Sequence, residues 1–189
     1  MFGKQSPEDK KKNDLKKLEA ARAFKSEGNE CFKLKNLKGA IRKYHQSILY
    51  LKAIGIATTS HTDLTGLVEQ APPEASLSQE SKQEATQLGI DCFNNLAACM
   101  LGQESPNYEK IVQHCNDSLK LGETTKALYR KGIALYHLND VDRAMEALKK
   151  ASNRADGQKD PNIRKYMGLC SVEISKQDNK LKETYKGMF

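Results

Sequence analysis

Five polar residues of the chain have the types and spacings that suit a site for an anionic group. Lys25 and Asn29 are four residues apart, and so are Lys126 and Arg130, so each pair shares one face if its segment is helical. The fifth residue, Asn95, corresponds to Arg130 when the chain is aligned with itself. Lysine and arginine supply positive charge, and asparagine amides donate hydrogen bonds without adding charge. These side chains could therefore converge on a ligand that carries carboxylates.

The sequence offers little support for catalysis or for a bound metal ion. His45, His61, His114 and His137 lack the spacing of metal ligands, and His114 faces a different direction from Cys115 on a helix. The glycines are scattered and form no phosphate-binding loop. The odd number of cysteines and the absence of a CxxC pair indicate small buried hydrophobic residues in a reducing compartment. We expect a non-enzymatic protein without a cofactor or metal.

Apolar residues recur at spacings of three and four along most of the chain, which predicts amphipathic helices. Few residues separate the first two stripes, and such short connections favour antiparallel helix pairs. Ser78 is a suitable N-cap, and Asp160 followed by Pro161 is typical of the start of a last helix. The expected helices cover about 15–34, 40–51, 79–101, 108–119, 127–136, 144–151 and 161–185.

The length and composition fit one helical domain with a tail. The chain has 189 residues, of which 38% are hydrophobic and 29% are charged, and we expect a charged flexible tail over 1–14 and a domain over 15–189. Little periodicity and the pair Pro72 and Pro73 predict an inserted loop over 55–77. No stretch approaches the ~18 consecutive apolar residues of a membrane span, and the N-terminus does not resemble a secretory signal. The expected location is the cytoplasm, with the nucleus open to a chain of this size.

The chain is also self-similar at a constant offset. Alignment of Gly28 with Gly132 brings a series of small and large apolar residues into register, and a middle unit fits between them with Ala97 at the small position. The middle unit needs a slightly longer turn near Ser105 and Pro106. The matching residues of the outer units are Phe32 and Tyr136, Leu37 and Val141, Ala40 and Ala144, Tyr44 and Leu148, and Ser47 and Ala151. The middle unit supplies Leu101, Tyr108, Ile111, Cys115 and Ser118.

These residue types predict a stack of helical hairpins. Small residues let two helices cross closely, and large apolar residues fill the space between pairs. One pair cannot bury its apolar face alone, so we expect three units to stack into an α-α superhelix with a concave inner surface. The last helix would cap the end of the stack. The expected repeats cover 21–54, 78–121 and 125–156, and the capping helix covers 161–185.

This pattern over residues 21–153 resembles the tetratricopeptide repeat, which has small residues at its eighth, twentieth and twenty-seventh positions. The segments "DCFNNLAACML", "NYEKI", "TKALYRKGIALYHL" and "YKGMF" are similar more narrowly to the tetratricopeptide repeat protein 9 family. The repeat domains of large immunophilins are also similar, but this chain contains no isomerase domain. The resemblance implies a protein-binding adaptor without catalytic activity.

The resemblance also implies a more specific site. Repeat co-chaperones of Hsp90 and Hsp70 grip a C-terminal Glu-Glu-Val-Asp tail with a "dicarboxylate clamp". The clamp has Lys and Asn in its first repeat, Asn in the second, and Lys and Arg in the third. The matching residues in this chain are Lys25 and Asn29 in "FKSEGN", Asn95 in "NNLAAC", and Lys126 and Arg130 in "KALYR". The implied partner is the acidic C-terminal peptide of Hsp90 or Hsp70, bound by electrostatics that salt would weaken.

Other interpretations remain open from the sequence. Any one of the five residues could be a solvated surface side chain, and Asn94 is an alternative to Asn95 that lies about 100° away around the helix. The groove could instead serve as a general scaffold for a different protein segment. The net charge of +7 and the basic N-terminal run could also favour nucleic acid or an anionic membrane, although no aromatic stackers or known motif accompany them. The sequence leaves the client, the preference between Hsp90 and Hsp70, and the oligomeric state undetermined.

Overall fold

The computed structural model describes residues 6–56 and 77–186, and every regular element in these ranges is an α-helix. The expected all-α class is confirmed. Most of the expected loop over 55–77 lies outside the described residues. The helices are α1 (Pro7–Lys33), α2 (Leu37–Lys52), α3 (Gln79–Leu101), α4 (Tyr108–Leu121), α5 (Thr125–His137), α6 (Val141–Ser152) and α7 (Pro161–Lys186).

Polar side chains just before the helices fix where most of them begin. Ser78 caps α3 as predicted, because its hydroxyl accepts a hydrogen bond from the backbone N–H of Ser81. Asn36, Asn107 and Thr124 cap α2, α4 and α5 in the same way. For α7, the Oδ1 atom of Asp160 accepts a hydrogen bond from the backbone N–H of Asn162 at 2.8 Å. These caps satisfy backbone donors that the helices themselves leave without partners.

The first helix begins earlier than the sequence predicted, so the expectation of a flexible tail over 1–14 is wrong for residues 7–14. Ser6 caps the helix, Pro7 stands at its start, and Glu8 and Asp9 lie in its first turn. Proline suits a first helical position, and acidic residues interact favourably with the positive end of the helix dipole. The charged run is therefore the beginning of α1, and Asp14, which the tail interpretation left in solvent, is buried.

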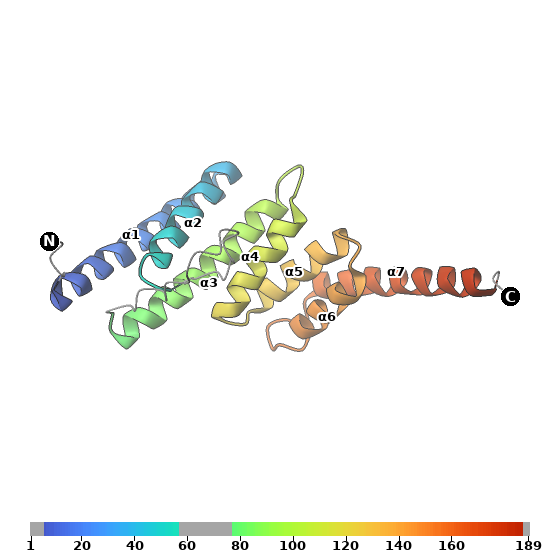
Figure 1. The fold of residues 1–189 in the computed structure, drawn as a ribbon. Helices are drawn as coiled ribbons and strands as arrows, with labels where there is room; N and C mark the ends of the chain where they lie inside the picture. The colour runs from blue at the N-terminus through green and yellow to red at the C-terminus, as the bar shows by residue number, and fades with distance from the viewer. Residues whose placement is uncertain (1–5, 57–76, 187–189) are drawn as a thin grey trace, which may run out of the picture.

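The helices stack in consecutive antiparallel pairs, α1 with α2, α3 with α4, and α5 with α6, as Figure 1 shows. Helix α3 also contacts both α1 and α5, so these three helices form a continuous inner layer. Hydrophobic clusters fill the spaces between successive pairs, and Leu51, Leu96, Ile111 and Leu148 are among the fully buried side chains. Each pair therefore buries its apolar face against its neighbour, which is how a repeat solenoid is stabilised.

Equivalent residues of the repeats make equivalent contacts, which confirms the internal alignment. A Cβ atom at Gly28 would lie 2.7 Å from Cε1 of Tyr44, and one at Gly132 would lie 2.6 Å from Cγ of Leu148. In both pairs, glycine leaves room for a large side chain from the partner helix.

Equivalent serines of the first two repeats also make equivalent hydrogen bonds to the inner helix. The Ser47 hydroxyl donates to the carbonyl oxygen of Ala21 at 2.7 Å, and the Ser118 hydroxyl donates to the carbonyl oxygen of Ile90 at 3.4 Å. Ala21 and Ile90 stand the same number of residues before the small positions Gly28 and Ala97. The register that the sequence predicted for the middle repeat therefore holds in three dimensions.

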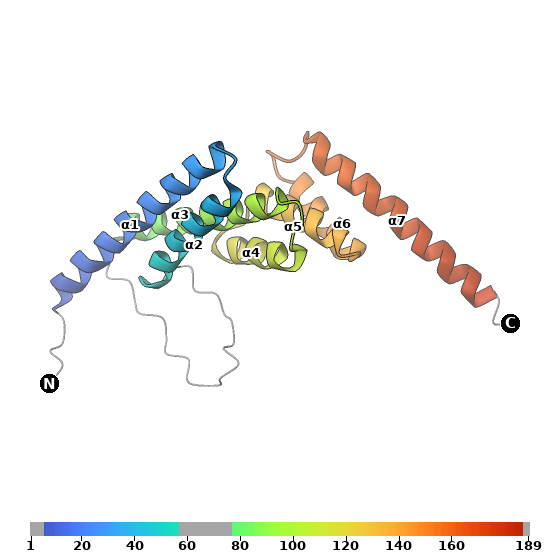
Figure 2. The same cartoon turned by 90° about the horizontal axis from the view of Figure 1, so that it is seen from above.

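The last helix covers the end of the stack with only its first half. Ile163 and Cys170 are buried against the third repeat, whereas Leu181 and Tyr185 are 55% and 57% exposed. Figure 2 shows α7 extending away from the stack beyond α6. The cap that the sequence predicted therefore comes from the first half of α7. Among the described residues, no helix combines the length and the apolar character that crossing a membrane requires.

Candidate functional site

A pocket of about 500 Å³ lies on the inner layer of helices. Ser26 of α1, Asn95 of α3 and Arg130 of α5 occupy the same position in the three repeats, two residues before each small residue, and all three line it. Equivalent positions face the same way in a solenoid, so the repeat architecture itself gathers these side chains. The lining residues are Ser26, Asn29, Glu30, Phe32, Lys33, Tyr44, Asn95, Ala98 and Arg130.

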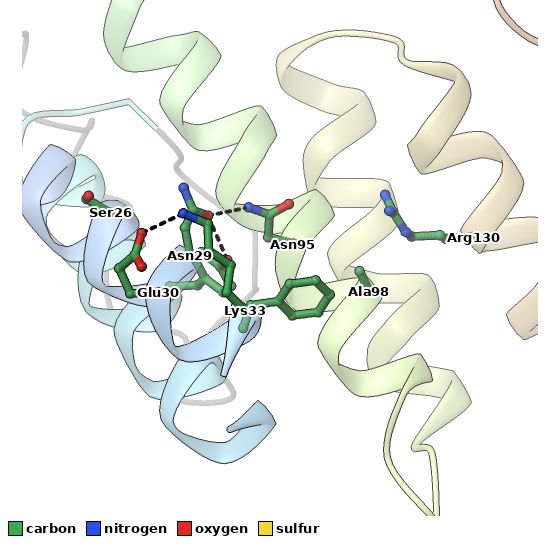
Figure 3. Close-up of a pocket in the computed structure, with 9 residues that line it drawn as sticks. Ser26, Asn29, Glu30, Lys33, Asn95, Ala98 and Arg130 are labelled. Carbon is green, nitrogen blue, oxygen red and sulfur yellow. Dashed lines mark hydrogen bonds and ion pairs between the residues drawn. The ribbon is translucent and has the colours of Figure 1, made fainter. Parts of the chain in front are cut away.

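A polar chain links the first two repeats at this pocket. The Oδ1 atom of Asn29 accepts hydrogen bonds from the Tyr44 hydroxyl at 2.8 Å and from Nδ2 of Asn95 at 3.2 Å. Figure 3 shows Asn95 facing Asn29 across the boundary between α1 and α3. Because both bonds use the oxygen of the Asn29 amide, they fix the amide orientation and leave its Nδ2 group able to donate to a ligand.

Tyr44 reaches this chain from the second helix of the first repeat. Its side chain is almost fully buried between α1 and α2, and this burial raises the pKa of Tyr44 to about 12. The phenol therefore keeps its proton at physiological pH and acts as a permanent donor to Asn29. Tyr44 is a positioning residue that orients the amide of Asn29.

Arg130 provides a positive charge to the pocket from the third repeat. It extends from α5 towards the side where Asn95 lies (Figure 3). Its Nη1 atom is buried and has no hydrogen-bond partner in the part of the chain that the structure describes. Burial lowers the pKa of Arg130, but a guanidinium group remains charged in proteins. A buried charged donor without an acceptor is costly, so an anionic ligand here would satisfy a group that the protein leaves open.

The structure separates the two candidate asparagines of the second repeat. Asn95 lines the pocket, whereas Asn94 is buried and its Nδ2 atom donates to the Thr124 hydroxyl at 3.2 Å. That bond joins α3 to the residue that caps α5, so Asn94 contributes to packing between repeats. Of the two registers considered, the one with Asn95 facing the groove is the one observed.

The two lysines of the predicted site lie outside the pocket lining. Nζ of Lys25 is 2.5 Å from Oδ2 of Asp91, an ion pair between α1 and α3. Lys126, at the start of α5, is exposed and forms no ion pair within the described ranges. The structure therefore brings together Asn29, Asn95 and Arg130, and it leaves Lys25 and Lys126 apart from them.

The pocket also has an apolar side. Phe32, which is 44% exposed, and the half-buried Ala98 lie in its wall. Glu30 and Lys33 form an ion pair at 2.8 Å at its edge, on the exposed side of α1. The pocket thus combines amide donors, one guanidinium group and an apolar surface, which suits a short peptide segment that ends in or carries a carboxylate.

The histidines and cysteines show no arrangement for metal binding or catalysis in the described residues. No group of three or more His, Cys, Asp or Glu side chains there could hold a metal ion. His45 and His114 lie with ring centroids 5.5 Å apart, between α2 and α4. Burial raises the pKa of the Cys92 thiol to about 11 and that of Cys115 to about 12, so both remain protonated and unreactive.

Two residues that matter for the pocket went unnoticed in the sequence. Tyr44 was assigned only a packing role because it aligns with Leu148 of the third repeat. Asp91 stands four residues before Asn95, a spacing that places both on one face of α3 and could have marked it as a neighbour of the site. In each case the missing information was the contact with another helix.

Comparison with known proteins finds relatives that match most of the chain. The chain is 35% identical over 170 residues to tetratricopeptide repeat protein 9C of Xenopus tropicalis, a match that covers 89% of this chain and 92% of the relative. No family model matches the chain.

Solved structures share the architecture. The C-terminal TPR-containing domain of a Plasmodium falciparum FK506-binding protein has a TM-score of 0.65 and 28% identity, and the match covers 92% of this chain and 95% of that domain. The Hsp90 co-chaperone Cns1 from Saccharomyces cerevisiae has a TM-score of 0.60 and 20% identity, over 90% of this chain and 44% of that protein. At this identity, the likeness to Cns1 is one of fold alone.

Proposed function

Because the chain belongs to the tetratricopeptide repeat protein 9 family, we propose that it is a non-enzymatic adaptor that binds the acidic C-terminal peptide of Hsp90 or Hsp70. The ligand would lie in the pocket between α1, α3 and α5. The observation that carries the proposal is the buried Nη1 atom of Arg130, which has no hydrogen-bond partner among the described residues and belongs to a pocket that Asn29 and Asn95 also line. These groups are donors, and a carboxylate is an acceptor that can satisfy several of them together.

The chemistry of such a peptide fits the pocket. The last residue of a Glu-Glu-Val-Asp tail carries two carboxylates, one on its side chain and one at the chain end. Arg130 and the amide of Asn29 would hold one of them, and the other would extend towards Lys25 or Lys126, outside the pocket lining. Charge-assisted hydrogen bonds contribute about 1.5–3 kcal/mol each, which, less ordering costs, suits an affinity near micromolar, or about −8 kcal/mol.

A calorimetric titration with a peptide ending in Glu-Glu-Val-Asp tests this function. Arg130→Ala should weaken binding at least about tenfold, because it removes a charge-assisted hydrogen bond in a buried setting. Arg143→Ala is a matched control, since Arg143 on α6 has a side chain that is 62% exposed and pairs with Asp140 away from the pocket. Binding by Arg130→Ala that equals that of the control would contradict the proposal.

A second candidate function is a scaffold for a different protein segment. It is favoured by the positions of the lysines, because Lys25 is already paired with Asp91 and Lys126 lies outside the pocket lining. A pull-down from cell extract separates the two functions. Under this second candidate, a charge reversal at Arg130 removes the captured partner, while the Glu-Glu-Val-Asp peptide neither binds the protein nor competes with that partner.

A further inference from the structure

Lys25 is held by a carboxylate of the protein itself. Its Nζ atom lies 2.5 Å from Oδ2 of Asp91, and the other oxygen of Asp91 accepts a hydrogen bond from Nε2 of Gln87 at 3.0 Å. The side chains of Lys25 and Asp91 are 25% and 36% exposed, so solvent and ligands can reach the pair. The ion pair is therefore accessible at the inner surface, one helical turn from Asn29 and Asn95.

The repeat alignment makes the presence of Asp91 unusual. Arg22, Asp91 and Lys126 occupy the same position in the three repeats, six residues before each small residue. The outer repeats thus place a basic side chain there, and the middle repeat places an acid between them. An acid at this position reduces the positive potential of the inner surface where an anionic ligand would approach.

We propose that Asp91 is a specificity-determining residue of the groove: its carboxylate occupies Lys25 in the free protein, and a ligand carboxylate must replace it there. This inference rests on the proposed function, because it concerns the same site. Asp91 competes with the ligand by engaging the Lys25 ammonium group, a cation that the ligand would use.

A consequence is that the ligand site has two parts, the pocket itself and the neighbouring Lys25–Asp91 ion pair. Arg130, Asn29 and Asn95 accept one carboxylate without disturbing any ion pair, whereas Lys25 becomes available only when Asp91 moves away. A ligand with a single carboxylate therefore uses the pocket alone. A ligand with two carboxylates gains less from its second one than it would if Asp91 were neutral.

Asp91→Asn tests the inference because it removes the charge and keeps the shape of the side chain. Titrated with the Glu-Glu-Val-Asp peptide, Asp91→Asn should bind about fivefold more tightly than the wild type, the gain expected from releasing a partly exposed ion pair. Glu84→Gln is the matched control. It removes the same charge from the same helix, where Glu84 pairs with Arg22 at 2.6 Å across the same α1–α3 boundary.

The double variant Lys25→Ala/Asp91→Asn, together with the two single variants, forms a double-mutant cycle. It should bind no more tightly than Lys25→Ala, since Asp91 acts on the ligand mainly through Lys25. The inference is overturned if Asp91→Asn binds no more tightly than Glu84→Gln, or if its gain survives without Lys25. When wild-type binding depends on Arg130 but not on Asp91, the proposed function stands and only this inference fails. An absence of binding in all variants overturns both.

Discussion

The first and third repeats share one packing solution and differ in what they add to it. In both, a glycine on the inner helix makes room for a large side chain of the outer helix, with Tyr44 beside Gly28 and Leu148 beside Gly132. Leu148 only fills space, whereas Tyr44 fills the same space and donates a hydrogen bond from its hydroxyl to Asn29. The first repeat thus orients an amide donor, and the third repeat supplies the charge of Arg130.

This difference shows how a repeat fold acquires a site without losing its core. The conserved geometry of the solenoid determines where side chains point, and single atoms at equivalent positions determine what they do there. Variants of the first and third repeats should therefore differ in their effects on stability and on peptide binding.

Lowering the pH should destabilise the interface between the first and second repeats more than any contact within the third repeat. His114 on α4 packs against His45 and Phe93, its Nδ1 atom is buried, and burial lowers the pKa of His114 to about 4. The folded state therefore binds this proton less readily than the unfolded chain does. The free energy of unfolding therefore has its full value above about pH 6.5, and it decreases by at most about 3 kcal/mol as the pH falls towards 4.

Urea unfolding curves between pH 7 and pH 4 measure this loss. His114→Met should flatten the pH dependence because methionine does not titrate in this range. A wild-type free energy of unfolding that stays constant from pH 7 to pH 5 would contradict the account of this junction.

Adding a methyl group at Gly28 or at Gly132 should destabilise the repeat that contains it, but only the change at Gly28 should also weaken peptide binding. A Cβ atom at Gly28 would push into the ring of Tyr44, and one at Gly132 would push into Leu148. We expect Gly28→Ala and Gly132→Ala each to cost about 1–2 kcal/mol of stability, since overpacking outweighs the higher helix propensity of alanine. Gly28→Ala should also weaken peptide binding, because it displaces the residue that orients Asn29. Equal affinities for the two variants, measured where both are folded, would remove the functional difference between the repeats.

Removing only the Tyr44 hydroxyl isolates the feature that the third repeat lacks. Tyr44→Phe keeps the packing against Gly28 but deprives Asn29 of one donor, so the amide can rotate and present its oxygen to the ligand. We expect a loss of about 1 kcal/mol in stability and of about fivefold in peptide affinity. Leu148→Met, a change of similar size in the third repeat, serves as the control and should leave the affinity unchanged. Thermal unfolding and titration calorimetry report the two effects.

The smallest effect should come from Lys126. This side chain is exposed at the start of α5, outside the pocket lining, so it acts on a ligand mainly through screened charge. Lys126→Ala should weaken peptide binding about twofold at low salt and not at all at high salt. A loss as large as that of Arg130→Ala would show that Lys126 enters the site directly when the ligand is bound.

The sequence predicted the fold well because the fold depends on local and periodic features. The helix at Gln79–Leu101 with its cap at Ser78, and the matching of Gly28 with Gly132, follow from spacing and capping alone. The start of α1 was missed because its lysine-rich run masked the capping signal of Ser6 and Pro7. Charge density argued for a tail, but a helix with a good cap tolerates a mixed charged surface.

The site was predictable only in part, because its geometry depends on contacts between helices. Asn95 and Arg130 follow from the repeat register, which places equivalent residues on one surface, whereas Asn29 was predicted from its spacing to Lys25 and from the resemblance to the clamp. The pairing of Lys25 with Asp91 follows from neither, since no periodic pattern reveals which acid of a neighbouring repeat lies within reach of a lysine. The role of the Tyr44 hydroxyl is hidden for the same reason.

The most direct test of the account compares two peptides that differ at one group. One ends in Glu-Glu-Val-Asp with a free carboxylate, and the other has the same sequence with a C-terminal amide. In NMR titrations of the wild-type protein, the free-carboxylate peptide should shift the side-chain amide resonances of Asn29 and Asn95, and the amidated peptide should bind at least about tenfold more weakly. Equal binding of the two peptides, or shifts confined to residues away from the pocket, would contradict the claim that the inner helices recognise a carboxylate.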